Sequence, residues 1–268
     1  MYKALIILLF FSLAANGQLI VNGSRNYTPF ANTYIYPYQP NFIWWDATNS
    51  ASYSGSGTTW YDLTTNAYYA TLAGSPNYNA SNPKNFKFNG ATTYTYSGAN
   101  YRIGQSLYSF GVWFNTNVSQ IGTLYSYRVG SPTYCQLTLV MAGNSGESTN
   151  GGKLVWADVD TLTTYVRSGI TTTAYNDSVW HYAVITRGSS VDSIYVDGSY
   201  NASTNSTTIP TIANSLGYTY LGTLSDGTST VSGDSYTGLI SDFEIYNYHL
   251  TSTQVAANWA AIKGKYGR

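Results

Sequence analysis

The feature that most constrains this chain is a repeated alternation between short apolar runs and clusters of turn-forming residues. The runs are rich in β-branched and aromatic side chains, and Gly, Ser, Asn and Asp separate them; "YSFGVWFN", "GKLVWADV" and "DSIYVDG" are examples. Many short strands with regular turn signals predict an all-β fold, in which two antiparallel sheets pack as a sandwich or jelly roll. At 268 residues the chain is long enough to form one large sandwich.

One stretch near the end departs from this pattern and predicts a short helix. Three apolar residues share one helical face: Val255, Trp259 and Ile262. Thr251 and Gln254 have the spacing of a capping box, and Gly264 stands where a C-terminal cap belongs. We therefore expect a single helix to close the domain.

The first 17 residues have the pattern of a signal peptide. Lys3 precedes an apolar run that ends at Ala15, and Ala15 and Gly17 are small residues suited to cleavage before Gln18. The alternative is a membrane anchor, but the run is shorter than the roughly 20 residues that span a bilayer. We expect an exported protein with no membrane insertion after cleavage.

The rest of the chain divides by composition. Residues 18–40 are polar and contain three of the seven prolines, which indicates an extended lead-in. We assign residues 41–263 to the sandwich and residues 264–268 to a tail. Cys135 is the only cysteine, so the fold has no intrachain disulfide and depends on its core.

Charge excludes two classes of partner. Charged residues make up 9% of the chain, with 12 basic and 12 acidic side chains and no basic run. Nucleic acid and anionic membranes require a positive field that this composition does not supply. The chain also has 28 tyrosines, so its polar surface must be built largely from Tyr, Ser, Thr and Asn.

His181 is one of two histidines and lies in a predicted strand. A period of two places Trp180 and Tyr182 on one face and His181 on the other. No second metal-ligating side chain lies within two residues on its own face, so we expect a structural role for His181.

Four segments in order resemble a known family. "WWDATNSASYSGSGTTWYDLTTNAYYATL" is similar to its opening segment, "FKFNGATTYTYSGANYRIGQSLYSFGVWFNT" to its early strands, "VWHYAVITRGSSVDSIYVDG" to its Trp-His strand pair, and "YTGLISDFEIYNYHLTSTQVAANW" to its terminal strand and helix. The family is the laminin-G-like domain of the concanavalin A-like lectin/glucanase superfamily. The resemblance runs from Asn41 to Ala261 and implies the concanavalin A-like sandwich. In one loop, "DLTTNAYYATL", the chain lacks the glycines that the family has around Asp62 and Asn66.

Catalysis is not expected. Glucanases of this superfamily place two carboxylates on one strand, because alternate residues project together into the sugar cleft. Asp242 and Glu244 are such a pair in "SDFEIYN", but the segment resembles the closing strand of the laminin-G-like fold. There the Asp ties the strand to its neighbours, so we expect a structural pair.

A calcium site at one rim is implied by the resemblance. Loops rich in Asp, Asn and Ser can supply the oxygen ligands that Ca²⁺ needs. The candidate ligands are Asp226, Asp234, Asp158 and Asp160. The alternative for each is a turn residue that hydrogen bonds to its own backbone.

Aromatic side chains on the middle strands are candidates for sugar contact. Exposed rings stack on sugar faces, whereas rings in strands more often pack in a core. The candidate ligand-binding residues are Tyr125, Tyr127, Arg128 and Trp156.

Three functional classes remain open from the sequence. The favoured one is a secreted, non-catalytic module that binds a glycan or a surface glycoprotein, with calcium as a candidate cofactor. A structural or adhesive surface component and a glycoside hydrolase are the alternatives, since one fold hosts many functions.

Overall fold

The computed structural model describes residues 35–97, 108–129, 135–143, 150–161, 164–189, 191–204, 217–224 and 234–268. For residues 129, 135–136, 159–161 and 164–167 only the backbone is described. All described residues belong to one compact unit, Tyr34–Arg268. The expected signal peptide, residues 1–17, and most of the expected lead-in lie outside them.

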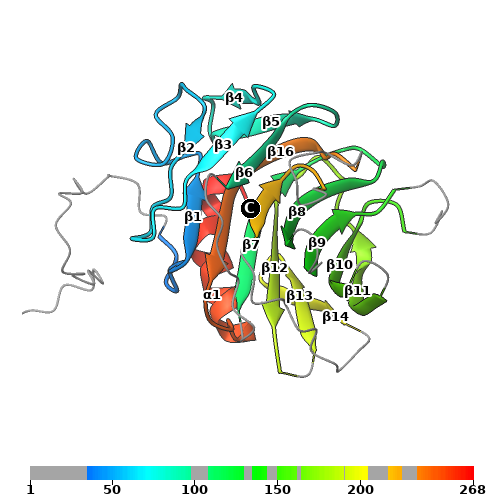
Figure 1. Cartoon of the computed structure of the whole chain (residues 1–268). Coiled ribbons are helices and arrows are strands. Elements are labelled where there is room, and N and C mark those ends of the chain that lie inside the picture. The colour runs from blue at the N-terminus through cyan, green and yellow to red at the C-terminus, as the bar shows by residue number, and fades with distance from the viewer. Residues whose placement is uncertain are drawn as a thin grey trace, which may run out of the picture. The chain divides into compact units, whose positions relative to one another are not determined.

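The described strands form two antiparallel sheets (Figure 1). Sheet A has, in order across the sheet, β14 (Ser199–Ser203), β13 (Asp192–Val196), β12 (His181–Arg187), β7 (Ser109–Asn115), β16 (Thr237–Tyr246), β5 (Asn85–Asn89) and β4 (Asn77–Asn79), and β1 (Ile43–Asp46) also pairs with β16. Sheet B has β11 (Thr164–Ala174), β10 (Lys153–Thr161), β9 (Cys135–Met141), β8 (Gly122–Val129), β15 (Tyr218–Leu221), β6 (Tyr94–Ser97), β3 (Ala70–Ala73) and β2 (Thr59–Trp60). The predicted two-sheet antiparallel sandwich is confirmed.

Aromatic side chains fill the space between the sheets. Phe110 of sheet A contacts Tyr125 and Trp156 of sheet B, with ring centroids 4.4 and 5.1 Å apart. Phe243 of β16 lies 5.3 Å from Tyr125 and 5.4 Å from the ring of Trp45 in β1. Close aromatic pairs of this kind add to the stabilisation that area burial provides.

The predicted helix is present as α1 (Ser252–Ile262), and the Thr251–Gln254 capping box is formed. Its C-terminal end differs from the prediction. The chain continues from Lys263 into a 3₁₀ turn, η1 (Lys263–Tyr266), and Gly267 rather than Gly264 takes the left-handed conformation, with φ of 70°. No helix among the described residues is long and apolar enough to cross a membrane.

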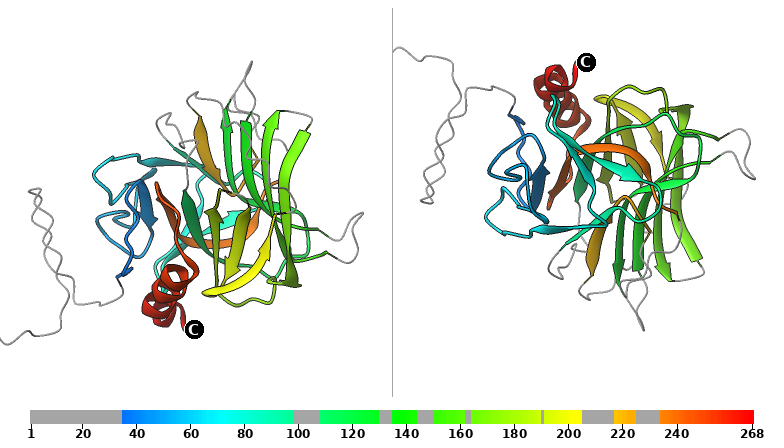
Figure 2. Two further views of the ribbon diagram at one scale, coloured as in Figure 1. Left: turned by 90° about the horizontal axis from the view of Figure 1, so that it is seen from below. Right: turned by 90° about the horizontal axis from the view of Figure 1, so that it is seen from above.

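Helix α1 packs on the outer face of sheet A, on the side of β16 and away from β8–β11 (Figure 2). Val255 and Ile262 of the helix are buried there in one cluster with Trp113, Tyr182 and Tyr246 of the sheet. The face of sheet A that points away from the sandwich core is therefore a second interior.

Both ends of the structured unit extend beyond the predicted range 41–263. Tyr36, expected in the lead-in, and Tyr266, expected in the tail, are buried in the cluster beneath the helix. The Tyr266 ring stacks on Trp113 at 3.8 Å. These contacts correct the predicted boundaries, because segments of ordinary loop composition are fixed by partners far away in the sequence.

Candidate functional site

Four tyrosines lie together on the outer face of sheet B, and we call them the tyrosine platform: Tyr94, Tyr96, Tyr218 and Tyr220. They come from the neighbouring strands β6 and β15, and Tyr96 is paired directly with Tyr220. The Tyr96 and Tyr220 rings are stacked at 5.9 Å. The ring centroid of Tyr220 lies 6.3 Å from that of Tyr94 and 6.4 Å from that of Tyr218.

Strand alternation places the platform on this face. In "YTYS" and "YTYL" the tyrosines occupy every second position, and the Thr95 and Thr219 side chains between them are fully buried. Tyr94, Tyr96 and Tyr218 stay partly exposed. A cluster of rings with accessible faces and hydroxyl groups can pack against the C–H face of a sugar and hydrogen bond to its hydroxyls.

Two further tyrosines stand beside the platform at the edge of the sheet. Tyr61 directly follows β2 and Tyr69 directly precedes β3, and these strands pair with each other next to β6. The side chains of Tyr61 and Tyr69 are 56% and 42% exposed. These two exposed rings therefore lie at the β2–β3 edge of sheet B.

Arg128 also lies on the platform side of sheet B. It is the direct cross-strand partner of Tyr218, so it shares a face with that tyrosine. Its side chain is partly buried. Arg128 is thus the predicted ligand-binding residue that the structure brings next to the platform.

The other three predicted ligand-binding residues lie in the core. Tyr125, Tyr127 and Trp156 are each 0% exposed and point between the sheets. This placement corrects the expectation that their rings form a sugar-stacking face. Their strands have the expected alternation, but the inner rather than the outer positions carry these rings.

The predicted calcium ligands are not brought together among the described residues. Asp158 is buried on the inner side of sheet B, where its Oδ2 lies 3.1 Å from Nη1 of Arg187. This internal ion pair corrects its assignment to a rim loop. Asp234 lies just before β16, and its carbonyl accepts a hydrogen bond from the Thr123 amide.

The remaining two candidates cannot be placed as side chains. Asp226 is outside the described residues, and for Asp160 only the backbone, in β10, is described. Within the described part of the chain, no group of three His, Cys, Asp or Glu side chains has the arrangement of a metal site.

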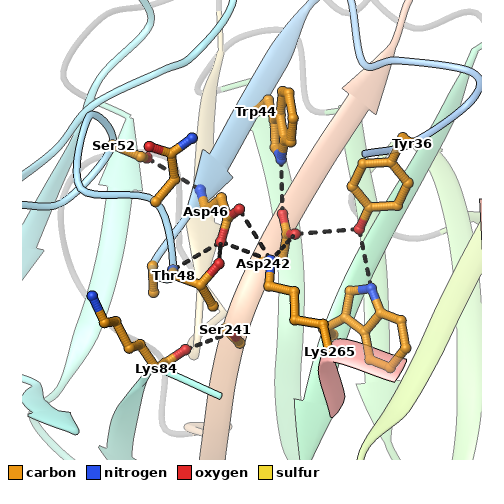
Figure 3. A network of polar contacts seen from close by, with 12 residues as sticks. Tyr36, Trp44, Asp46, Thr48, Ser52, Lys84, Ser241, Asp242 and Lys265 are labelled. Atoms are coloured by element: carbon orange, nitrogen blue, oxygen red, sulfur yellow. Dashed lines mark hydrogen bonds and ion pairs between the residues drawn. The ribbon is translucent and has the colours of Figure 1, made fainter. Parts of the chain in front are cut away.

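A second polar cluster, the carboxylate clasp, lies beneath the helix on the outer face of sheet A (Figure 3). We define it as Asp46, Asp242, Glu244, Lys265 and Tyr36. Lys265 Nζ lies 3.0 Å from Asp46 Oδ2 and 3.5 Å from Asp242 Oδ2. The Tyr36 hydroxyl hydrogen bonds to Glu244 and lies 3.2 Å from Asp242 Oδ2.

Burial controls the protonation of the clasp. Loss of solvent raises the pKa of Glu244 to about 7, and it also raises the pKa of Asp242, with a further contribution from the nearby Asp46. Burial alone would lower the pKa of Lys265, but the carboxylates of Asp46 and Asp242 raise it overall. Two of the three carboxyl groups of the clasp, Asp242 and Glu244, therefore have pKa values above the usual range for their side chains.

The paired carboxylates of β16 are structural in this arrangement. Asp242 and Glu244 share a face, as predicted, but each is 0% exposed beneath the helix. Tyr182 donates a hydrogen bond to Glu244 at 2.8 Å, and the Trp44 indole N–H donates one to Asp242 at 3.1 Å. In this conformation the two groups cannot flank a sugar bond.

His181 is held by two aspartates. Its Nδ1 lies 2.9 Å from Asp197 and its Nε2 lies 3.0 Å from Asp177. Arg268 pairs with the same Asp197 at 3.0 Å. These contacts tie the β13–β14 turn to the C-terminal residue, which fits the structural role expected for His181.

Residues 88–256 match the profile of the laminin G group described as "Concanavalin A-like lectin/glucanases superfamily". This match covers more than half of the chain. The chain belongs to this superfamily. Among curated proteins, none matches the sequence.

Solved structures of the same fold include an enzyme and toxin domains. A Trypanosoma rangeli sialidase in complex with 2,3-difluoro-KDN matches with a TM-score of 0.60 and 14% identity, over 87% of this chain and 34% of that chain. The binding domain of botulinum neurotoxin DC in complex with SialylT matches with a TM-score of 0.59 and 12% identity, over 83% of this chain and 52% of that chain. The binding domain of botulinum neurotoxin serotype D matches with a TM-score of 0.56 and 14% identity, over 82% and 51%.

These matches show the fold of this superfamily member. The chain spans about a third of the sialidase and about half of the toxin chains. The function must therefore be argued from the residues of this chain, because one fold hosts many functions.

Proposed function

We propose that the protein is a non-catalytic carbohydrate-binding module whose ligand lies on the outer face of sheet B. The observation that carries the proposal is the tyrosine platform. Three of its four rings, those of Tyr94, Tyr96 and Tyr218, are partly exposed, and Tyr96 stacks on the buried Tyr220, on a sheet face over which no helix is packed among the described residues. Sugar-binding neighbours of the same fold, such as the toxin domain in complex with SialylT, support it.

The proposal also covers location and cofactor. The apolar run followed by small residues before Gln18 supports export and removal of residues 1–17. Calcium would act only through loop side chains such as Asp226 and Asp234, since Asp158 is committed to Arg187. A glycan or the glycan of a surface glycoprotein is then the partner.

The test is a glycan-array screen of the chain from Gln18 to Arg268, run with calcium and with a chelator. The array compares wild type with Tyr96→Ala and with Tyr200→Ala, a matched control whose 59%-exposed ring lies on β14 of the other sheet. We expect Tyr96→Ala to lose about fivefold or more in affinity, since stacking of an aromatic ring contributes about 1 kcal/mol or more.

Two outcomes count against the proposal. Wild type that binds no glycan in either buffer would reject it in favour of a structural or adhesive surface component. Equal losses in Tyr96→Ala and Tyr200→Ala would show that the platform is not the binding surface. Binding that the chelator abolishes would add calcium as a cofactor.

A further inference from the structure

Lys265 and Asp46 meet in a part of the clasp that is almost closed to water (Figure 3). The Lys265 Nζ lies 3.1 Å from Oδ1 and 3.0 Å from Oδ2 of Asp46. Because these two distances are nearly equal, the nitrogen lies close to the plane that bisects the carboxyl group, and this plane contains Cγ. The two side chains are only 12% and 8% exposed. An amine nitrogen and a carboxyl carbon are thus held side by side.

The Asp46 carboxyl group is polarised on one of its oxygens. Its Oδ1 accepts hydrogen bonds from the Thr48 amide at 2.8 Å and from the Thr48 hydroxyl at 2.7 Å. Donors aimed at such an oxygen stabilise the negative charge that develops there when a nucleophile adds to the carboxyl carbon. The Asp46 amide donates to Ser52 Oγ at 3.1 Å, so the backbone that carries this group is fixed as well.

Asp242 is placed to carry a proton for this pair. The carboxylates of Asp46 and Asp242 raise the pKa of Lys265, so the amine starts as an ammonium and must lose a proton before it can react. Asp242 Oδ2 lies 3.5 Å from Lys265 Nζ, and the Asp242 side chain is 0% exposed. Burial and the nearby Asp46 raise the pKa of Asp242, so this carboxyl group can take up a proton. A positioned carboxyl group of this kind acts as a general base and then as a general acid.

Condensation would remove two charges from a site that has little water. The clasp keeps an ammonium and a carboxylate away from solvent, and the loss of hydration opposes their attraction. An amide between the same two groups is neutral. Holding the groups together also removes most of the entropic cost of a reaction between separate molecules, and exclusion of water protects the product from hydrolysis. The site therefore favours both formation and retention of an amide.

We propose that Lys265 and Asp46 condense to an intramolecular isopeptide bond, with Asp242 as the proton carrier. Asp242 takes a proton from the Lys265 ammonium, and the free amine adds to Cγ of Asp46. The Cγ–Oδ2 bond then breaks, and Oδ2 leaves as water with two protons that come from the nitrogen, one of them returned by Asp242. The products are an Nζ–Cγ amide and one water molecule. Ammonium and carboxylate lose their charges together, so the reaction needs no further reactant.

The bond joins β1 to the 3₁₀ turn that follows helix α1. Asp46 and Lys265 are 219 positions apart, and the chain has a single cysteine, so no intrachain disulfide can form a comparable link. A covalent link that closes a long loop restricts the unfolded chain more than one that closes a short loop. The ion-paired chain is the reactant, and its protonation is that of the clasp described above.

The first test is intact-mass spectrometry of the purified chain from Gln18 to Arg268, unfolded before measurement. Wild type is compared with Lys265→Arg, which keeps the charge but has a guanidinium that stays protonated and does not condense. Asp242→Asn removes the proton carrier. Lys263→Arg is the matched control, because Lys263 lies exposed in the same 3₁₀ turn.

Trypsin digestion then locates the bond. Asp46 lies in the tryptic peptide of residues 26–84. A lysine whose amine is in an amide is not cleaved, so residues 264–268 should stay whole and joined to residues 26–84. A succinimide at Asp197–Gly198 also loses one water, but it joins no peptides.

We expect wild type and Lys263→Arg to be lighter than their sequences by one water and to give the joined peptides. Lys265→Arg should have its full sequence mass. In freshly purified Asp242→Asn the joined fraction should be about tenfold or more lower than in wild type, since a positioned general base contributes at least this much to the rate. Circular dichroism checks that each variant is folded.

The wild-type chain alone can overturn the proposal. Wild type at its full sequence mass, or lighter by one water but without the joined peptides, would show that the bond does not form. If Asp242→Asn contained as much of the joined peptides as wild type, the role of Asp242 as proton carrier would be wrong.

Discussion

The two outer faces of the sandwich carry similar side chains in different environments. The outer face of sheet A presents tryptophan, tyrosine and carboxylate side chains, and helix α1 packs over these side chains together with η1, which contributes Lys265. On the outer face of sheet B, Tyr94, Tyr96, Tyr218 and Arg128 remain partly exposed, whereas Tyr220 is buried. Tyr182 of sheet A and Tyr96 of sheet B both occupy alternating strand positions, yet only Tyr182 is fully buried. The two faces therefore differ in what packs on them: a helix lies on the outer face of sheet A, whereas no described helix lies on the platform side of sheet B.

Removing the Trp113 ring from the covered face of sheet A should have the largest effect on the free energy of unfolding. Trp113 stacks on Tyr266 at 3.8 Å, on Tyr182 at 5.0 Å and on Trp259 at 5.2 Å. Trp113→Ala should lower the free energy of unfolding by about 3–5 kcal/mol, because it leaves a cavity among these rings. Urea unfolding followed by circular dichroism measures the loss. A loss below about 1 kcal/mol would show that the helix does not depend on this face.

The Trp113 cluster also shows what the sequence could and could not predict. The capping box and the apolar period of α1 are local signals, and both were sufficient to place the helix. Strand alternation likewise predicted that Trp180 and Tyr182 share a face opposite His181, which the structure confirms. These features depend on residues close together in the chain.

Other features depend on partners far away in the sequence. Lys265 pairs with Asp46, 219 positions earlier, so nothing near the C-terminus indicates that the expected tail is fixed. Alternation predicts two faces for each strand but not which face becomes the core. Trp156 was therefore expected to be accessible, while Tyr96, in the short "YTYS", was missed as a candidate. Paired tyrosine-threonine alternation in "YTYS" and "YTYL" was the available signal for the platform.

Breaking the clasp should have the next largest effect. Lys265→Met removes the ammonium and leaves Asp46, Asp242 and Glu244 buried together. Removing one partner of a buried ion pair costs about 3–5 kcal/mol, because a charge is left without compensation. We expect a loss of about 3 kcal/mol at pH 8 and a smaller loss at pH 5, where the carboxyl groups take up protons. Urea unfolding at both pH values tests this, and a loss that does not change with pH would contradict it.

Glu244 should make stability fall as the pH rises. Burial raises the pKa of Glu244 from 4.5 to about 7 in the folded protein. Between these values the folded state keeps a proton that the unfolded state has released, so the free energy of unfolding decreases with rising pH and is constant above the folded pKa. At about 1.4 kcal/mol per pKa unit, the decrease is on the order of 3 to 3.5 kcal/mol.

Glu244→Gln should remove this dependence, since the amide is neutral at every pH. Its oxygen can still accept the Tyr36 hydrogen bond, and its NH₂ can donate to the Tyr182 hydroxyl. Unfolding free energies measured from pH 4.5 to pH 8 should fall for wild type and vary less for the variant. As a control, the unfolding free energy of the platform variant Tyr96→Ala should change with pH as it does in wild type. If the free energies of wild type and Glu244→Gln changed in parallel with pH, Glu244 would not be the source of the pH dependence.

Removing one tyrosine hydroxyl from each outer face should have the smallest effect on stability, and it compares the two faces directly. Tyr182→Phe deletes the donor to Glu244 in a fully buried site, and the carboxylate loses one of its partners. The cost should be about 1–2 kcal/mol, because a buried polar group is left less satisfied. Tyr96→Phe makes the same chemical change on a partly exposed ring, where water can replace the lost partner, so its effect on unfolding should stay within about 0.5 kcal/mol. On glycan binding the order should reverse, with Tyr182→Phe neutral and Tyr96→Phe weaker where the hydroxyl contacts the sugar. If both variants lost the same stability, the platform would be as enclosed as the clasp, and sheet B would have no more open a face than sheet A.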